Sequence, residues 1–343
     1  MPHRTFLKFM WPSLLVMFLL IALPIVSVFV QSLYVEHEQI VLETENCGPF
    51  GCKTTVAVDR EATDKLREEE PLGRFNGMDT YTNRSHLAFQ ELGEAWDASS
   101  SMGDFVDRMM NLPFYKALVF TLAYTFIVTP LVIVLGLVVA LCVNALPKLV
   151  KGPTIFLSLL PMIVTPLIGS LILFWMIDAD GVIGATLQIW FDDDSLSLKA
   201  SPTLTWITLF IYGIWSSVPF SFIVFYAGLQ TVPTDTLEAS MIDGASRWET
   251  IRFVVIPHMA PLVTFVALMQ LMDNFRVFEP IVGFAAEAHA TSLSWLIYND
   301  LRGTDSQLFG SAASTSMLTI LGVAILLMPV FIRTWRDFNR KSA

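Results

Sequence analysis

The chain has 343 residues, of which 54% are hydrophobic and only 15% are charged, and its mean hydropathy is +0.59. These values are typical of an integral membrane protein and argue against a soluble domain. The formal net charge of −10 argues against a nucleic-acid partner, so the expected surroundings of the chain are a lipid bilayer.

Six apolar runs are each long enough to cross roughly 30 Å of hydrocarbon, which takes about 20 residues. They lie at about 10–34, 115–146, 153–177, 203–229, 258–284 and 311–333. The predicted fold is therefore an all-α membrane protein with six transmembrane helices.

The first and third runs are each expected to form one membrane span. The first follows Arg4 and Lys8 and is longer than the apolar core of a signal peptide, which predicts an uncleaved anchor; a cleaved signal peptide is the alternative. The third contains Pro161 and Pro166. Transmembrane helices tolerate proline because neighbouring helices can satisfy the carbonyl groups that it frees.

Basic residues in the short loops set the expected orientation, because Lys and Arg concentrate on the cytoplasmic side of a membrane. They precede the first run, separate the second from the third and follow the sixth: Arg4, Lys8, Lys148, Lys151, Arg333, Arg336, Arg340 and Lys341. With six spans all of them fall on one side, and the acidic segments 178–181 and 192–194 fall on the other. Both termini are therefore predicted to be cytoplasmic.

Residues 36–113 are polar, charged and too long for a simple connection, so they are predicted to form a small external subdomain. Within it, Cys47 and Cys52 flank a GPFG turn, which predicts a small disulfide loop on the oxidising side of the membrane. Two free thiols are the alternative. A zinc site would need four ligands, and the only nearby histidines are His37 and His86, so no metal site is predicted.

The sequence contains no recognisable enzyme signature. The phosphate-binding pattern G-x-x-x-x-G-K-[ST], a His-Glu-x-x-His helix and a nucleophile elbow are all absent. No cofactor is therefore expected on this chain, and if a nucleotide drives the protein, the ATPase is a separate chain.

Residues 231–257 form a polar block between the fourth and fifth runs. After Pro233, Asp235 and Glu238 have the spacing of a capping box, so a helix is expected to begin there. Four apolar residues recur at helical spacing and predict one apolar face: Leu237, Met241, Ala245 and Trp248. Gly244, in the middle, suggests a bend or a close approach by another backbone. A helix lying at the lipid interface is the plainer interpretation of the same pattern.

The same block carries a longer pattern. Glu238-Ala239-Ser240, Gly244 and Val254-x-Ile256-Pro257 resemble the EAA loop of the membrane subunits of bacterial ABC importers, E-A-A-x3-G-x9-I-x-L-P, with every spacing kept. The departures are Ser240 for alanine, Val254 for isoleucine and Ile256 for leucine. The flanking AGLQTVP and the internal IDGASRW are similar to the carbohydrate-uptake branch of that family.

The resemblance extends over roughly 1–35 and 110–343. The segments 159–184 and 214–230 look like the third and fourth spans of these permeases, and FRVFEPIVG resembles part of their fifth span. The Gly-Gly-Pro turn that is common after that segment is missing. The insertion at 36–113 has no counterpart, and we expect it either to touch a binding protein or to brace the first two spans.

The resemblance implies the six-span transmembrane domain of a type I ABC importer in the bacterial inner membrane. The loop is then a cytoplasmic coupling helix that docks on an ATPase subunit, with Glu238 and Gly244 as its core and Ala239, Asp243 and Arg247 as supporting contacts. ATP and Mg are expected on two partner ATPase subunits, and a second permease chain is expected to pair with this one. A periplasmic solute-binding protein is expected to deliver a sugar or sugar-like solute, which crosses by alternating access.

Charged residues inside a membrane span are costly, at roughly 2.5–3.5 kcal/mol each on insertion scales, and they mark pathways or pairs. The fifth run carries such a polar group, MQLMDNFRVFEP. The substrate-pathway candidates are Asn274, Arg276, Phe278 and Glu279 of this run and Trp215 of the fourth. The alternative is that Asp273, Arg276 and Glu279 pair with one another at i,i+3 spacing, or with the partner permease.

An ion-coupled secondary transporter is the alternative function, with Asp273, Arg276 or Glu279 as the relay. Such carriers usually contain inverted repeats, and none is recognisable in the six runs. Sugars, polyols and glycosides all lie within the cargo class that the family resemblance implies.

Overall fold

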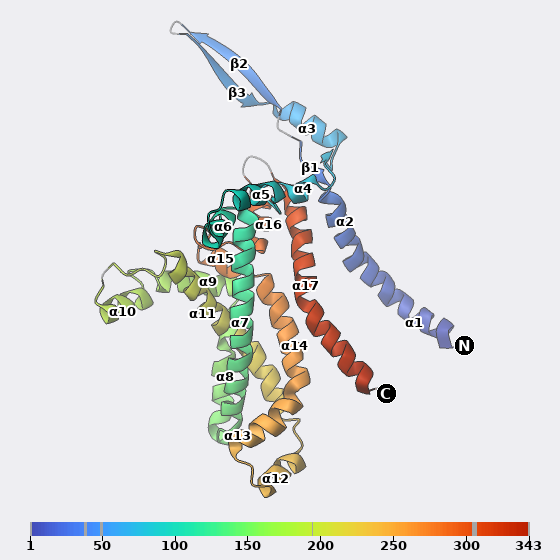
Figure 1. Ribbon diagram of the computed structural model, residues 1–343, viewed down its shortest axis with the longest axis vertical. Helices are drawn as coiled ribbons and strands as arrows, with labels where there is room; N and C mark the ends of the chain where they lie inside the picture. Colours follow the sequence, from blue (N-terminus) through green and yellow to red (C-terminus); the bar gives the residue numbers. More distant parts are fainter. Residues whose placement is uncertain (1, 38–39, 49–50, 194, 304–306, 342–343) are drawn as a thin grey trace. The chain divides into compact units, whose positions relative to one another are not determined.

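The computed structural model describes the chain except for residues 1, 38–39, 49–50, 194, 304–306 and 342–343 (Figure 1). For residues 43–48 and 51–57 it describes the backbone alone. The chain divides into two compact units, one of Met1–Tyr115 with Leu296–Ile320 and one of Lys116–Trp295 with Leu321–Ala343.

The first unit contains the N-terminal helix and the polar insertion. In chain order its elements are α1 (Pro2–Met17), the π-helical turn η1 (Phe18–Ala22), α2 (Leu23–Gln31), β1 (Tyr34–Val35), β2 (Val41–Gly48), β3 (Gly51–Val58), α3 (Arg60–Glu69), β4 (Arg74–Phe75), α4 (Asp79–Thr82), α5 (Phe89–Asp97) and α6 (Met102–Met109). The first residues of α7 and parts of α16 and α17 complete it.

The continuous helical run from α1 to α2 contains one candidate membrane span, Lys8–Gln31. The π-helical turn lies just before Pro24, whose ring nitrogen has no hydrogen to continue the regular pattern. Most large apolar side chains from Phe18 to Val30 are exposed in the isolated chain, as expected of a helix that faces lipid. The helix lies within a few residues of the predicted range 10–34.

The first unit departs from the all-α prediction, because it contains two small antiparallel sheets, one within the insertion and one that joins it to the preceding residues. Strands β1 and β4 pair Tyr34 with Phe75, and the two rings meet edge to face at 5.4 Å. Strands β2 and β3 form a hairpin, whose β-branched residues favour extended backbone. Its register sets Cys47 directly opposite Cys52, but their side chains lie outside the described residues, so the disulfide stays a prediction.

A fully buried histidine joins the insertion to the beginning of α17 within the first unit. His86 Nδ1 lies 2.9 Å from Asn83 Oδ1, and its Nε2 lies 3.1 Å from both the carbonyl oxygen of Ser311 and the hydroxyl of Thr315. Burial lowers the pKa of His86, so the neutral imidazole is favoured. This network fixes the segment before α5 on the beginning of α17.

The second unit is a helical bundle. Its elements are α7 (Pro113–Asn144), α8 (Lys148–Ile163), α9 (Pro166–Met176), α10 (Val182–Phe191), α11 (Pro202–Leu229), α12 (Thr234–Ile242), α13 (Arg247–Thr250), the π-helical turn η2 (Ile251–Val255), α14 (Ile256–Phe275) and α15 (Glu279–Gly283). The remaining helices, α16 (Leu293–Arg302) and α17 (Phe309–Lys341), are divided between the two units.

Among the described residues, five helices are long and apolar enough to cross a membrane, and a bent pair brings the total to six. The bent pair is α8 with α9, which meet at 92° where the sequence predicts one span over 153–177. The residue before a proline avoids the helical region, so Thr165, which precedes Pro166, is extended. The Tyr212 hydroxyl donates to the Pro166 carbonyl oxygen at 2.6 Å and so holds the bend.

The fifth span also differs from its predicted range of 258–284. It begins at Arg247 and ends at Phe275, after which the backbone leaves the helix at Arg276. The separate short helix α15 then begins at Glu279, with Pro280 in its first turn. Because Pro is favoured at a helix start and disfavoured inside one, residues 276–284 of the predicted span form a turn and a new helix.

Two apolar clusters form the core of the second unit. One surrounds Phe120, Tyr212 and Ile281, and the other surrounds Phe222 and Met259. Between them α7 and α11 pack so closely that a Cβ on Gly136 would lie 2.6 Å from the side chain of Ser221. The bundle therefore fixes α11 firmly, and with it the helix that leads into the polar loop.

Candidate functional site

The polar loop contains two short helices, α12 and α13, in the turn between α11 and α14 (Figure 1). Helix α12 ends at Ile242, and Gly244 follows with a left-handed φ of +78°. The Ala245 amide donates to the Ser240 carbonyl and the Gly244 amide donates to the Met241 carbonyl, which is the Schellman arrangement of a helix C-terminus. Gly244 thus ends a helix rather than lying inside one.

The other prediction for Gly244, a close approach by another backbone, finds no support within the described part of the chain. No atom there lies within 4 Å of a Cβ placed on this glycine. In the isolated chain, glycine is therefore favoured at this position because of its backbone conformation, since L-residues rarely adopt a left-handed φ.

The cap at the start of this loop is not where the sequence placed it. Helix α12 follows Pro233 with no side-chain cap, so the predicted capping box of Asp235 and Glu238 does not form. A complete capping box occurs instead at α13, where Ser246 accepts from the Glu249 amide and the Glu249 carboxylate accepts from the Ser246 amide. The cap lies there because Gly244 has ended the first helix and a second one must begin.

Ser240, which replaces an alanine of the family pattern, has a structural use. It is 8% exposed, its hydroxyl donates to the Leu237 carbonyl at 2.7 Å, and it lies 3.2 Å from the hydroxyl of Thr250. The two hydroxyls connect α12 to α13, so the two short helices are held as one piece.

The surface of this loop is open. The five residues predicted to contact an ATPase are all exposed: Glu238, Ala239, Asp243, Gly244 and Arg247. Among the apolar residues, Ile242 is 86% exposed and Trp248 is 66% exposed, whereas Leu237 packs inward. The predicted single apolar face is therefore wrong, because the break at Gly244 separates its members into two helices.

A cavity of about 510 Å³ lies in the second unit, on the side of the bundle where α8 and α9 bend. Its lining comes from several elements: Tyr124, Pro161, Met162, Val164, Pro166, Ser216, Ser217, Asp273, Asn274, Arg276, Val277, Glu279 and Pro280. The structure thus brings together three of the five predicted pathway residues, Asn274, Arg276 and Glu279. A volume of this order suits a small ligand.

Trp215 and Phe278, the two predicted aromatic contacts, are outside the lining of this cavity. Trp215 is 49% exposed and its ring lies tilted against that of Tyr212, with centroids 5.9 Å apart. The residues that follow it, Ser216 and Ser217, line the cavity instead. Trp215 therefore lies on a different face of α11 from Ser216 and Ser217. Which face of α11 lines the cavity depends on the rotation of this helix about its axis, and the sequence alone does not predict that rotation.

The charges of the cavity are unevenly paired. Arg276 forms an ion pair with Asp273 at 3.1 Å, as the i,i+3 spacing predicts, and both side chains are more than half exposed. Glu279 makes no ion pair with any described residue, so the predicted second pair with Arg276 does not form. One carboxylate at the start of α15 is therefore left available to a ligand or to another chain.

Two features near the cavity were not predicted, the serine pair on α11 and the bend between α8 and α9. Ser216 and Ser217 are adjacent polar residues inside an apolar helix, which is a visible signal of a polar lining. The bend was signalled by Pro166, since α8 continues through Pro161 and the helix is interrupted only before Pro166. Both features supply one wall of the cavity.

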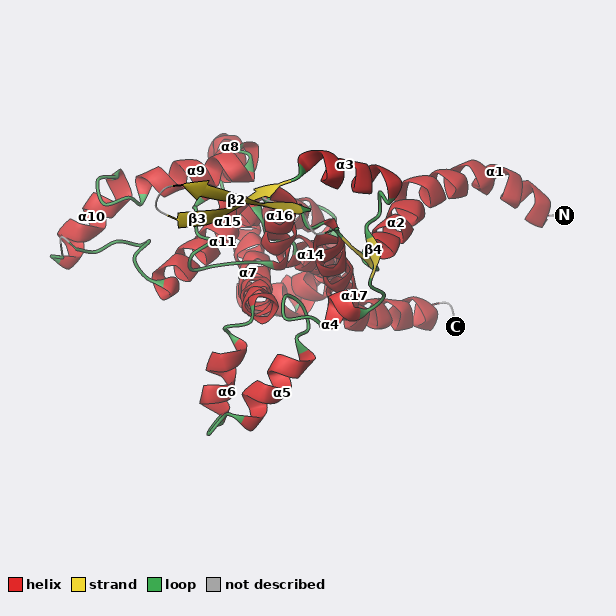
Figure 2. Cartoon of the chain, turned by 90° about the horizontal axis from the view of Figure 1, so that it is seen from above, coloured by secondary structure: helices red, strands yellow, loops and turns green. Residues whose placement is uncertain are grey.

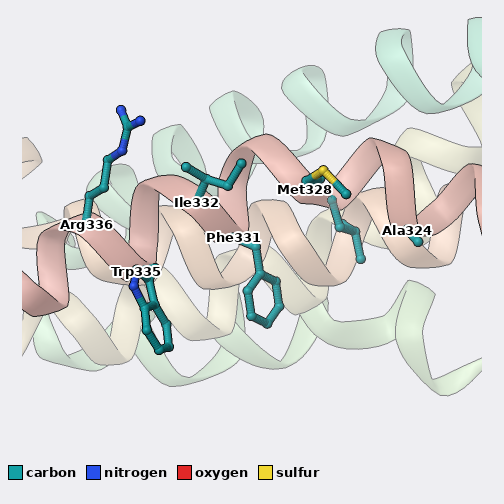
Figure 3. Close-up of a pocket in the computed structure, with 7 residues that line it drawn as sticks. Ala324, Met328, Phe331, Ile332, Trp335 and Arg336 are labelled. Atoms are coloured by element: carbon teal, nitrogen blue, oxygen red, sulfur yellow. The ribbon is translucent and has the colours of Figure 1, made fainter.

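A second hollow, of about 570 Å³, is lined by α17 alone and is almost wholly apolar. Figure 3 shows Phe331 and Trp335 extending from the same side of this helix, with Arg336 near its end. An apolar surface on a candidate membrane span is what lipid contact requires. Apart from Arg336 the lining is apolar, so this hollow lacks the hydroxyl, amide and carboxylate groups of the first cavity.

Comparison with protein families gives one match over most of the chain. The model described as "Binding-protein-dependent transport system inner membrane component" matches residues 99–337. The match covers both the polar loop and the cavity, and it leaves out most of the insertion.

Curated relatives are similar over about two thirds of the chain. The multiple sugar-binding transport system permease protein MsmF of Streptococcus mutans is 30% identical over 226 residues, which are 64% of this chain and 76% of that protein. The trehalose transport system permease protein SugA of Mycobacterium tuberculosis is 27% identical over 233 residues, which are 68% and 73% of the two chains.

A solved structure has the same fold. A chain of a bacterial ABC transporter involved in the import of the acidic polysaccharide alginate superposes with a TM-score of 0.60 at 17% identity, over 81% of this chain and 96% of that one. At this identity the likeness speaks for the fold: a helical transmembrane domain of the ABC importer type.

Proposed function

We propose a sugar-import function on this ground: the chain belongs to the family of inner membrane components of binding-protein-dependent transport systems. It is a multi-pass, mainly helical transport subunit rather than an enzyme. The family match over residues 99–337 is the observation that carries the proposal.

The proposed cargo is a sugar or a sugar-like solute. Relatives that are named for multiple sugars, trehalose and lactose support this class. The cavity near Ser216, Asn274 and Glu279 is the proposed passage, because it combines hydroxyl, amide and carboxylate groups that can hydrogen-bond to sugar hydroxyls. This chain is proposed to share the passage with a second permease subunit.

The proposed drive is ATP hydrolysis on two partner ATPase subunits, which bind the nucleotide and Mg. The exposed loop of α12 and α13 is the proposed docking element, with Glu238 and Gly244 at its centre and Ala239, Asp243 and Arg247 around them. Three features support this role: the large exposed side chains of Ile242 and Trp248, the rigid connection of the two helices through Ser240, and the firm packing of α11. A rigid loop transmits closure of the ATPase pair to the spans as alternating access.

The proposed orientation sets both termini and the coupling loop in the cytoplasm, in accordance with the distribution of Lys and Arg. The insertion then lies in the periplasm, on the side where a solute-binding protein delivers the cargo. A neighbouring structure of the same fold was solved with a ligand-bound periplasmic protein, which supports a partner of this kind.

The test is uptake of radiolabelled trehalose, lactose and maltose by proteoliposomes that contain the full complex, with ATP hydrolysis measured in parallel. We expect uptake that requires ATP and persists with a protonophore. A Glu238→Lys, Gly244→Asp double variant is expected to lose stimulated hydrolysis and uptake together, whereas the matched charge reversal Glu68→Lys on exposed α3 is expected to keep both. Uptake that needs an ion gradient and not ATP would overturn the proposal.

A further inference from the structure

Helices α5 and α6 form a pair that the transport function leaves unexplained. They have 9 and 8 residues, they follow one another closely, and they pack against each other (Figure 2). The rings of Trp96 on α5 and Phe105 on α6 meet edge to face, with centroids 5.2 Å apart. Ser101 caps α6 by accepting from the Asp104 amide. The pair is thus a defined helical hairpin.

One surface of each helix in this hairpin carries large apolar side chains that stay exposed among the residues that the structure describes. On α5, Phe89 and Trp96 are two turns apart and each is 58% exposed. On α6, Met102 and Val106 are one turn apart and are 66% and 42% exposed. Side chains at these spacings lie on one face of a helix. A hairpin in water would expose all four at a cost in free energy.

The remaining positions of the hairpin are strongly acidic. The charged residues among them are Glu91, Glu94, Asp97, Asp104, Asp107 and Arg108, five carboxylates and one guanidinium. Arg108 pairs with Asp104 at 3.2 Å on an exposed turn. The polar face therefore suits water, and it offers no attraction to an anionic surface.

Both ends of the hairpin are fixed to the first turn of α7. The hydroxyl of Tyr115 donates to the Leu87 carbonyl oxygen at 2.7 Å, just before α5 begins. At the other end, three residues separate the end of α6 from Pro113, the start of α7, and they reach at most roughly 10–11 Å. Leu112 and Phe114 are 6% and 5% exposed, so this junction is packed. The hairpin therefore lies within a short distance of the point where a membrane span begins.

We propose that the α5–α6 hairpin lies in the membrane interface beside the start of α7. Phe89, Trp96, Met102 and Val106 enter the boundary between headgroups and acyl chains, and the acidic face points to water. The lipid is favoured over a protein partner because α7 places the hairpin at the level of that boundary, and Trp and Phe prefer this level. Because the polar face is acidic, contact depends on apolar area and not on lipid charge.

The test measures spin-label depth in the full complex in nanodiscs of phosphatidylcholine. Single labels replace neighbouring residues of opposite face, Val106→Cys against Asp107→Cys and Trp96→Cys against Asp97→Cys. The background carries Cys47→Ser, Cys52→Ser and Cys142→Ala. Labels at 106 and 96 are expected to be relaxed more by oxygen than by a water-soluble nickel chelate. Labels at 107 and 97 are expected to be relaxed more by the nickel chelate than by oxygen. Added salt or phosphatidylglycerol is expected to leave this ordering unchanged.

Two outcomes would overturn the proposal. Relaxation by the nickel chelate at all four positions would show a hairpin in water, and protection from both reagents at 106 and 96 would show a protein partner. A second measurement uses the unmodified chain and phosphatidylcholine with a diazirine in its acyl chain. Illumination is expected to attach lipid to the peptides that contain residues 89–106. If none of these peptides carries attached lipid, the proposal is overturned.

Discussion

The side-chain amide of Asn274 donates a hydrogen bond to the hydroxyl of Thr129 at 2.9 Å and joins α14 to α7 beside the cavity. Both residues are almost completely buried, with 5% and 4% of their surface exposed. A buried hydrogen bond of this kind fixes the wall of the cavity, so Asn274 acts first through structure.

Removing either partner is expected to leave the other unsatisfied. Asn274→Leu and Thr129→Val should each cost about 1–3 kcal/mol of stability, and the double variant should cost less than their sum. The check is the melting temperature of the purified complex together with its uptake rate. If Asn274→Leu abolishes uptake at a melting temperature equal to that of Thr129→Val, Asn274 contacts the cargo directly.

Glu279 should affect transport without affecting the fold. It is exposed and has no ion pair among the described residues, while the Arg276 charge beside it is balanced by Asp273. A hydrogen bond to a charged group contributes about 1.5–3 kcal/mol, which corresponds to roughly a 10- to 100-fold change in affinity. Glu279→Gln is therefore expected to raise the KM for the transported sugar on that scale at an unchanged melting temperature. An unchanged KM would exclude contact between Glu279 and the cargo.

Substitutions at Gly244 test whether glycine is needed there for its left-handed backbone or for the space that it leaves to a partner. Because its φ is +78°, Gly244→Ala should cost about 1–2 kcal/mol in the helix end, and Gly244→Asn should cost less, since Asn tolerates this region. Coupled ATP hydrolysis is expected to fall in the order Gly, Asn, Ala. Gly152→Ala is the control, because open space surrounds that helical glycine. If Asn is as damaging as Ala, a partner backbone approaches Gly244 and the requirement is space.

The stability of the first unit should fall as the pH drops below the ordinary histidine pKa of 6.5. Burial lowers the pKa of His86, so in this range the unfolded state takes up a proton that the folded state resists. Burial also raises the pKa of Asp300, which favours its neutral form and acts in the opposite direction in acid. A His86→Gln variant keeps the second effect and removes the first.

The difference in stability between wild type and His86→Gln is therefore expected to narrow below pH 6.5. This difference is measured by hydrogen exchange of the peptides around residues 80–88 and 309–320, with a correction for the pH dependence of intrinsic exchange. If the stability difference between wild type and His86→Gln instead widens in acid, the folded state stabilises the protonated imidazolium of His86, which donates to the carbonyl oxygen of Ser311.

The register of β2 and β3 predicts a disulfide between Cys47 and Cys52. Alkylation without reductant, read by intact mass, is expected to modify Cys142 only, because Cys142 is free and exposed and the other two cysteines are predicted to be bonded. A loop of this length should stabilise the hairpin by about 2 kcal/mol. Alkylation of all three thiols in protein taken directly from the membrane would contradict the prediction.

The parts of the fold that the sequence predicted well are those in which one local signal dominates. Long apolar runs located the helices, and the spacing around Glu238 and Gly244 identified the loop. Where two signals competed, the prediction missed the course of the helix. Pro166 was read as tolerated within a span, yet it begins a new helix at 92° to the previous one.

The cavity was only partly predictable for a similar reason. Asn274, Arg276 and Glu279 are conspicuous because charges and amides are rare in apolar runs. Ser217 and Trp215 differ by two residues and face different surroundings, which depends on the rotation of α11 against α7 and α14. That rotation is set by long-range packing, for example of Gly136 on Ser221, and no local pattern encodes it.

The bend between α8 and α9 also has a consequence for the order in which the chain is assembled during synthesis. With 11 residues, α9 reaches roughly 16 Å, about half of the hydrocarbon thickness, and cannot cross alone. Its anchors come from parts made later: Tyr212 holds the Pro166 carbonyl, and Ser170 donates to the Glu279 carbonyl at 3.3 Å. This half-helix therefore reaches its final position only after the ribosome has passed α15, and a chain that stops earlier leaves it without a fixed place.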